Sequence, residues 1–154
     1  MDEKELNKEI EALSNTIKTK DFFTRKLRES DWDTLVKWWD SWPEWQAPAR
    51  NFLPDNATGG LMVEKNGVPI VAGFIYETNS AGVLFEWVVS NPDYREKDRQ
   101  DAIEKLLIDA ENKIKEMGYN YIFSIGRSKS LIKTHKKLGW HVDDSPSHEI
   151  LKKL

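Results

Sequence analysis

The chain has 154 residues, which is the length of a single domain and enough to bury a hydrophobic core. Hydrophobic residues make up 39% and charged residues 32%, and the net charge of -3 excludes a global basic field that would attract nucleic acid. No cysteine is present, which excludes disulfides, cysteine-based zinc sites and a cysteine nucleophile.

The N-terminus is acidic and polar, whereas a secretory signal starts basic and then turns apolar. The longest apolar stretch, residues 68–75, contains Pro69 and Gly73 and is too short to span a bilayer. We therefore expect a cytoplasmic protein, or one in the host cytoplasm if it is viral, with no membrane contact.

The first predicted element is a helix over residues 2–18. Its apolar residues recur at steps of four, three and four and form a narrow stripe flanked by charges. The stripe consists of Leu6, Ile10, Leu13 and Ile17. Such a stripe suits docking on a surface or on a partner's helix. We assign residues 1–20 to an N-terminal helical extension and residues 21–154 to the domain.

The next elements are a strand and a second helix. Residues 22–27 alternate roughly as a strand. The helix is expected to start near Ser30 or Asp31, either of which can cap it, and Pro43 ends it.

The middle of the chain is rich in strands. Residues 60–64, 69–78 and 83–90 are predicted strands, and Asn66-Gly67 is a hairpin turn between the first two. The third strand is apolar on both faces, as expected at the centre of a covered sheet.

A long amphipathic helix over residues 98–117 follows. A strand over 119–125, a short helix over 128–138 and short strands over 140–142 and 148–151 complete the pattern. This order predicts an α/β fold with an α+β mixed sheet, antiparallel hairpins first and a crossover helix after the central strand.

The segment from Val88 to Gln100 joins the central strand to the long helix. Backbone N–H groups and the helix dipole favour a phosphate at such a junction. Arg95, Lys97 and Arg99 add positive charge to the same loop.

Three motifs resemble those of the GNAT superfamily of N-acetyltransferases. Val-x-x-Asn-Pro-x-Tyr-Arg over residues 88–95 resembles its cofactor motif, and Leu-Ile-x-x-His-Lys-Lys-Leu-Gly-Trp over 131–140 resembles its second motif. Thr-Arg-Lys-Leu-Arg-x-x-Asp-x-x-x-Leu over 24–35 resembles its first strand and helix. The resemblance covers about residues 22–151 and is nearest to small stand-alone GNAT proteins of tailed bacteriophages.

The resemblance implies a GNAT-like fold and direct transfer of an acetyl group from acetyl-CoA to an amine. The backbone of Val88, Val89 and Ser90 would hold the acetyl group and pantetheine arm where the central strand diverges from the next parallel strand. The loop residues implied to hold the pyrophosphate are Arg95, Glu96, Lys97, Asp98, Arg99 and Gln100. A small-molecule or protein amine is the acceptor, no metal is expected, and a homodimer is the assembly that the family suggests.

Glu86 is the candidate general base. It lies two residues before Val88, which predicts that both side chains share a face of the buried strand. Burial raises the pKa of a carboxyl group and suits it to accept a proton near neutral pH. The alternative is a structural carboxylate paired with an arginine or a hydroxyl group.

His135 is the candidate general acid, because it occupies the place where the family often has a tyrosine that acts as the general acid. Leu131 and Leu138 share its helical face, so a packed structural histidine is the alternative. Tyr94 and Tyr121 are weaker substitutes for the same role.

Five tryptophans lie in a short segment, a region that forms one wall of the acceptor site in GNAT proteins. They are Trp32, Trp38, Trp39, Trp42 and Trp45. We expect Trp39 and Trp42 in the core. Trp38 and Trp45 are the candidate substrate residues, gripping a cationic amine by cation–π contact or a planar group by stacking.

Asp98 and Gln100 stand where the GNAT loop has small residues, which let the backbone approach a phosphate closely. Asp98 as a helix N-cap that points away from the ligand is one explanation. The other is a GNAT-fold binding or structural module that has lost catalysis and acts through protein partners.

Overall fold

The computed structural model describes residues 2–18 and 20–154, and its core is a five-stranded mixed sheet with the strand order β1-β2-β3-β4-β5. The strands are β1 (Phe22–Lys26), β2 (Gly60–Lys65), β3 (Val68–Tyr76), β4 (Gly82–Ser90) and β5 (Tyr121–Phe123). The first four are antiparallel neighbours, whereas β5 runs parallel to β4. This confirms the predicted mixed sheet with antiparallel hairpins first.

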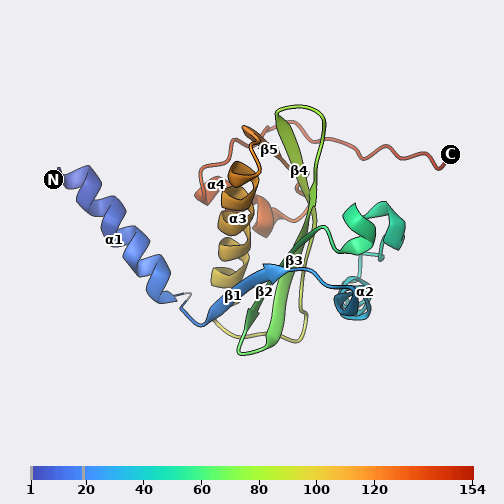
Figure 1. Ribbon diagram of the computed structural model, residues 1–154, viewed down its shortest axis with the longest axis horizontal. Helices are drawn as coiled ribbons and strands as arrows, with labels where there is room; N and C mark the ends of the chain where they lie inside the picture. The colour runs from blue at the N-terminus through green and yellow to red at the C-terminus, as the bar shows by residue number, and fades with distance from the viewer. Residues whose placement is uncertain (1, 19) are drawn as a thin grey trace.

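Helices cover both faces of the sheet (Figure 1). The helices are α1 (Glu3–Lys18), α2 (Trp32–Ser41), α3 (Arg99–Glu116) and α4 (Lys129–Lys137), with short 3-10 segments η1 (Glu29–Asp31), η2 (Arg50–Phe52) and η3 (Pro54–Ala57). Helix α3 lies on one face and carries the chain from β4 to β5, which confirms the predicted crossover. Helix α2 and the segments η2 and η3 lie on the other face.

Each face has its own hydrophobic cluster. On the α2 side, Trp39 and Phe74 stack with ring centroids 6.2 Å apart. On the α3 side, Leu106 and Leu107 pack against Phe85 of β4. Strand β4 is therefore covered on both sides, which explains its apolar sequence.

The hairpin between β2 and β3 turns at Asn66 and Gly67, with φ values of 51° and 80°. Both residues take the left-handed conformation that a type I′ turn requires. The prediction of this turn is confirmed.

Helix α1 extends away from the sheet (Figure 1), and three of its apolar side chains are exposed to solvent. Leu6, Ile10 and Leu13 are 48%, 57% and 62% exposed. The side chain of Ile17, the fourth residue of the predicted stripe, lies outside the described residues. Within residues 2–18 and 20–154, no helix combines the length and hydropathy needed to cross a membrane.

Two predictions about local structure are wrong. Neither Ser30 nor Asp31 caps α2 through its side chain, because both belong to the 3-10 segment η1 that leads directly into the helix. Residues 140–142 and 148–151 form no strand, and the chain after α4 is an extended tail.

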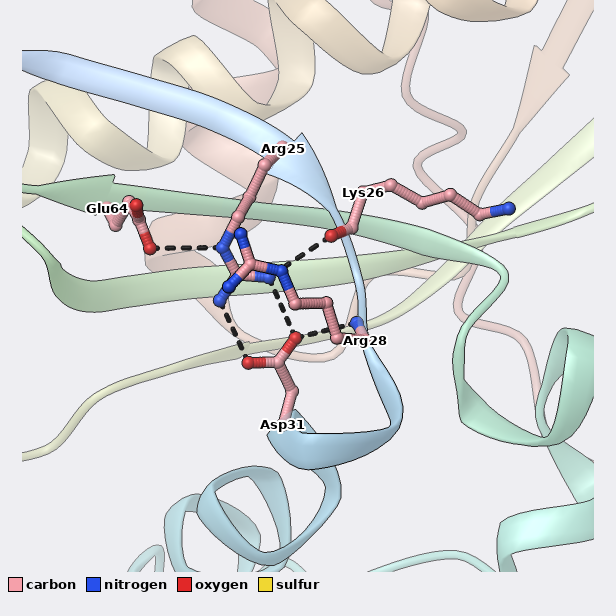
Figure 2. A network of polar contacts seen from close by, with 5 residues as sticks. All are labelled: Arg25, Lys26, Arg28, Asp31 and Glu64. Atoms are coloured by element: carbon pink, nitrogen blue, oxygen red, sulfur yellow. Dashed lines mark hydrogen bonds and ion pairs between the residues drawn. The ribbon is translucent and has the colours of Figure 1, made fainter.

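The carboxylate of Asp31 instead binds a guanidinium group beneath the sheet edge (Figure 2). Arg25 of β1 donates two hydrogen bonds to Asp31, at 2.8 and 2.9 Å, and one to Glu64 of β2 at 3.0 Å. The backbone N–H of Arg28 also donates to Asp31, at 2.8 Å. This network ties the start of α2 to β1 and β2, and so positions the α2 tryptophans.

Candidate functional site

Strand β4 contains a β-bulge near its centre. Between the cross-strand pairs Ala72–Val89 and Phe74–Glu86, β4 has one residue more than β3. Trp87 within the bulge has φ 58°, a conformation that a bulky side chain rarely takes. Bulges of this kind redirect side chains and often lie beside functional sites.

The bulge overturns the prediction that Glu86 and Val88 share a face. Glu86 lies opposite Phe74 and so points to the α2 face, whereas Val88 packs against the cluster on the α3 face. The extra residue interrupts the two-residue alternation on which the prediction was based. As a result, Glu86 and Trp87 both lie on the α2 face of the sheet.

Strand β5 diverges from β4 shortly after the two begin to pair. Their pairing covers three residues of each strand and ends at Leu84 and Phe123. Beyond it, the Ser124 hydroxyl donates to the Phe85 carbonyl at 2.6 Å, and the Ile125 N–H donates to Glu86 Oε1 at 2.7 Å. The remainder of β4 has a neighbouring strand on one side only within the described part of the chain.

A cavity of about 760 Å³ opens at this divergence. It contains seven of the nine residues predicted to hold the cofactor: Val88, Val89, Ser90, Glu96, Lys97, Arg99 and Gln100. Its size lies within the range of ordinary small-molecule sites. The two predicted residues outside it are Arg95, whose side chain donates to the Pro92 carbonyl at 3.3 Å, and Asp98.

One end of the cavity is cationic and lies at the N-terminus of α3. The Arg99 guanidinium donates to the Ser90 hydroxyl at 2.6 Å and lies 5.2 Å from the ring centroid of Trp42. Lys97 lines the same end, as does the exposed Glu96. Across residues 2–18 and 20–154, no ion pair joins Lys97 or Arg99 to a carboxylate. This end can therefore accept an anion.

The two unusual loop residues both make contacts within the protein. The carboxylate of Asp98 accepts from Lys65 Nζ at 2.6 Å and from the Tyr94 hydroxyl at 2.7 Å, which turns it toward β2. Asp98 occupies the predicted N-cap position of α3, but its side chain makes no capping hydrogen bond. Gln100 donates to the Thr134 hydroxyl at 2.8 Å and so links α3 to α4.

Glu86 lines the cavity and is half-buried. Burial raises the pKa of its carboxyl group to about 7, against smaller lowering effects of the Ile125 N–H and the Arg127 charge. No ion pair to Glu86 occurs in the described part of the chain. A carboxyl group with this pKa exchanges protons readily near neutral pH.

His135 is buried away from the cavity. Its Nδ1 lies 2.7 Å from the Leu131 carbonyl, and its ring meets Trp140 edge-on with centroids 4.7 Å apart. Within the described residues, its Nε2 atom has no hydrogen-bond partner. This position favours the structural interpretation. Tyr94 and Tyr121 do not line the cavity either.

The other end of the cavity is aromatic. Trp45 lines it, as predicted for a substrate residue, whereas Trp38 is 5% exposed and belongs to the α2-side core. Trp42 packs against the α2-side core, as expected, but it is only partly buried, also lines the cavity, and donates to the Ser90 carbonyl at 3.1 Å. Trp39 is in the core and also reaches the cavity wall.

Sequence reasoning missed three aromatic residues of this end: Phe52, Tyr76 and Trp87. Phe52 and Trp87 meet edge-on with centroids 6.1 Å apart, and the Tyr76 hydroxyl donates to the Phe52 carbonyl at 3.2 Å. The sequence could have indicated Tyr76, because it lies two residues from Phe74 on a predicted strand and so shares its face. No sequence pattern could have indicated Trp87, because the direction of its side chain depends on the bulge.

A scan against known protein families finds no match, and neither does a search of curated proteins. Solved structures do match. N-acetylglutamate synthase from Neisseria gonorrhoeae, complexed with coenzyme A and L-arginine, gives a TM-score of 0.65 at 12% identity. The match covers 82% of this chain and 29% of the synthase, so the chain spans less than a third of that protein.

Two further structures match over most of both chains. The ribosomal-protein-S18-alanine N-acetyltransferase from Escherichia coli has a TM-score of 0.61 at 11% identity, covering 77% of this chain and 76% of that one. A putative acetyltransferase from Salmonella typhimurium with its cofactor acetyl-CoA has a TM-score of 0.57 at 17% identity, covering 80% and 81%. These matches show that the chain has the GNAT fold.

Proposed function

We propose that the protein is an acetyl-CoA-dependent N-acetyltransferase that moves an acetyl group to an amine by direct attack on the thioester. The observation that carries this proposal is the cationic end of the cavity. Lys97 and Arg99 lie beside the N-terminus of α3, without carboxylate partners among the described residues, where β4 and β5 diverge. The Neisseria and Salmonella structures, which contain coenzyme A or acetyl-CoA, support the choice of ligand.

The cavity residues fit the chemical parts of acetyl-CoA. Lys97, Arg99 and the first N–H groups of α3 supply positive charge for the pyrophosphate. Val88, Val89 and Ser90 lie where β4 has no β5 partner in the described structure, so their backbone supplies hydrogen bonds for the pantetheine arm and the acetyl carbonyl. Bound acetyl-CoA supplies an activated acyl group.

Glu86 acts as the general base in this proposal. The amine nitrogen bonds to the acetyl carbon, the carbon–sulfur bond breaks, and the electron pair leaves on sulfur. An ammonium acceptor loses two protons in the process. One goes to the Glu86 carboxylate and the other to the departing sulfur, so the products are an N-acetyl amine and coenzyme A. The structure does not bring His135 to this step.

Calorimetric titration of acetyl-CoA, with coenzyme A as a second ligand, tests the proposal. Arg99→Gln should weaken binding about 10- to 150-fold, the equivalent of a charge-assisted hydrogen bond of roughly 1.5–3 kcal/mol. Arg95→Gln is the matched control, because Arg95 is on the same loop but outside the cavity. Absence of binding at millimolar acetyl-CoA to the folded protein would overturn the proposal.

A second candidate function is a GNAT-fold module that binds protein partners. The exposed stripe on α1 favours it, and we propose that residues 1–20 form an extension separate from the domain of residues 21–154. Light scattering of the full chain and of an Ile10→Glu variant tests whether the stripe joins two copies. A dimer that Ile10→Glu converts to monomer supports this role, and a monomer in both cases excludes self-association.

A further inference from the structure

The aromatic end of the cavity has a defined composition and shape. It consists of Trp45, Phe52, Tyr76 and Trp87. These residues come from three separate parts of the chain: the segment after α2, the short helix η2, and the paired strands β3 and β4. Phe52 is 42% exposed although it contacts Trp87 edge-on, so one face of this cluster is open. Such rings bind a flat apolar group by edge-on or offset contacts.

The net charge at this end depends on one carboxyl group, that of Glu86. Arg127 lies 5.4 Å from the ring centroid of Trp45, but it forms an ion pair with Glu149 of the C-terminal tail. Glu86 is the neighbouring carboxyl group, and the described residues give it no ion pair. Tyr76 lies two residues beyond Phe74, the cross-strand partner of Glu86, so Tyr76 and Glu86 are diagonal neighbours on the same face of the sheet.

The aromatic and cationic ends are separated along β4. Glu86 and Trp87 lie at the bulge, and Ser90, which binds Arg99, lies at the end of the strand. Four residues of fully extended backbone span about 13 Å, and the bulge shortens this distance. A ligand at the aromatic end can therefore bind while the cationic end holds a phosphate.

Resting on the proposed function, we infer that the acceptor is an arylalkylamine, a primary ammonium group joined by a short alkyl arm to an aromatic ring. The ring packs against Phe52, Trp87 and Trp45, and the ammonium group faces Glu86.

Other acceptor classes fit this end less well. An amino acid would bring a carboxylate that needs a free cation, yet the guanidinium that lies beside Trp45, on Arg127, is paired with Glu149. A polyamine would need several free carboxylates at this end, whereas Glu149 is paired with Arg127 and Glu96 lies at the cationic end, which leaves Glu86. One carboxyl group surrounded by rings suits one ammonium group on a ring.

Three probes separate these features. Phenethylamine carries a ring and an ammonium group, butylamine lacks the ring, and 3-phenylpropionate replaces the ammonium group with a carboxylate. Calorimetry on the full chain without acetyl-CoA measures binding of each probe, independently of the proposed reaction. Phenethylamine should bind at least ten-fold more tightly than either of the others.

Turnover provides the second measurement. Release of coenzyme A is followed with a thiol reagent, and the chain contributes no background because it contains no cysteine. The ratio of kcat/KM for phenethylamine to that for butylamine should exceed ten.

Phe52→Leu removes a ring from the site and should lower this ratio at least three-fold. Phe23→Leu on β1 is the matched control, because Phe23 is 60% exposed and lies outside the cavity. It should leave the ratio unchanged.

The outcomes distinguish the two proposals. Equal binding and turnover of phenethylamine and butylamine, with acetyl-CoA still bound, would overturn the arylalkylamine inference and leave the acetyltransferase proposal intact. Tighter binding of phenethylamine that weakens in Phe52→Leu, with no binding of acetyl-CoA, would support the amine site and overturn the proposed reaction. Equal loss in Phe52→Leu and Phe23→Leu would contradict a specific role for the aromatic end.

Discussion

Replacing Arg25 with methionine should destabilise the protein strongly, although Arg25 lies outside the cavity. Its guanidinium makes three hydrogen bonds to two carboxylates, and the side chains of Arg25 and Asp31 are each 9% exposed (Figure 2). Methionine leaves the Asp31 carboxylate buried with only the Arg28 N–H as a partner. Breaking a buried pair in this way costs about 3–5 kcal/mol.

A loss of this size should be easy to measure. For a domain of this length, 1 kcal/mol lowers Tm by roughly 2–4 °C, so Arg25→Met should lower Tm by roughly 6–20 °C. Thermal unfolding followed by circular dichroism at pH 7 gives this value. Lys115→Met is the control: the Lys115–Glu111 pair is 66% and 43% exposed, and its loss should change stability by less than about 1 kcal/mol.

The pH dependence checks the cause of this loss. Burial raises the pKa of Asp31, but hydrogen bonds from Arg25 and Arg28 outweigh it and hold the pKa below the ordinary 3.8. The ion pair therefore stabilises the fold above pH 3.8 and is lost as pH falls through the lowered pKa. The difference between wild type and Arg25→Met should shrink in acid. A difference of equal size at pH 7 and pH 3 would refute the electrostatic reasoning.

Three further changes follow from the structure. Glu86→Gln should lower acetyl transfer about 10²- to 10⁴-fold, and the wild-type rate should rise through about pH 7 as Glu86 loses its proton; a flat pH–rate profile would rule out Glu86 as the base. Gly67→Ala should cost about 1–2 kcal/mol in denaturant unfolding, because φ is +80° there, whereas Gly82→Ala should cost less. Lys65→Met should weaken acetyl-CoA binding several-fold, because it frees the Asp98 carboxylate beside the proposed phosphate site. Adding Asp98→Ala should restore the binding, and no recovery in the double variant would contradict this account.

The fold was predictable from the sequence because its main signals are local. The Asn66-Gly67 turn and the helical periodicity of α3 each depend on neighbouring residues only. The C-terminal strands were predicted wrongly from equally short patterns. A strand needs a partner, and residues 148–151 lie in a tail that pairs with none of the described strands.

The candidate site was only partly predictable, because two of its features depend on tertiary contacts. The β4 bulge lies opposite Gly73, where a Cβ atom would come within 2.3 Å of the Phe85 ring. The bulge changes the direction of Trp87 and Glu86, and no local sequence pattern predicts it. Similarly, Asp98 was identified as unusual for the loop, but its contact with Lys65 joins residues far apart in the sequence.

Because β4 and β5 diverge at the cavity, their pairing is the weakest connection between neighbouring strands of the sheet. Three paired residues of each strand, together with two side-chain hydrogen bonds just beyond them, connect β5 to its neighbour. Local opening of this join should therefore need less free energy than unfolding of the central hairpins. A ligand that bridges the two strands binds only when they are correctly placed, so its occupancy would slow amide hydrogen exchange in β5 by mass action. The separation of β4 and β5 that makes room for a ligand thus also makes the rigidity of β5 depend on a bound ligand.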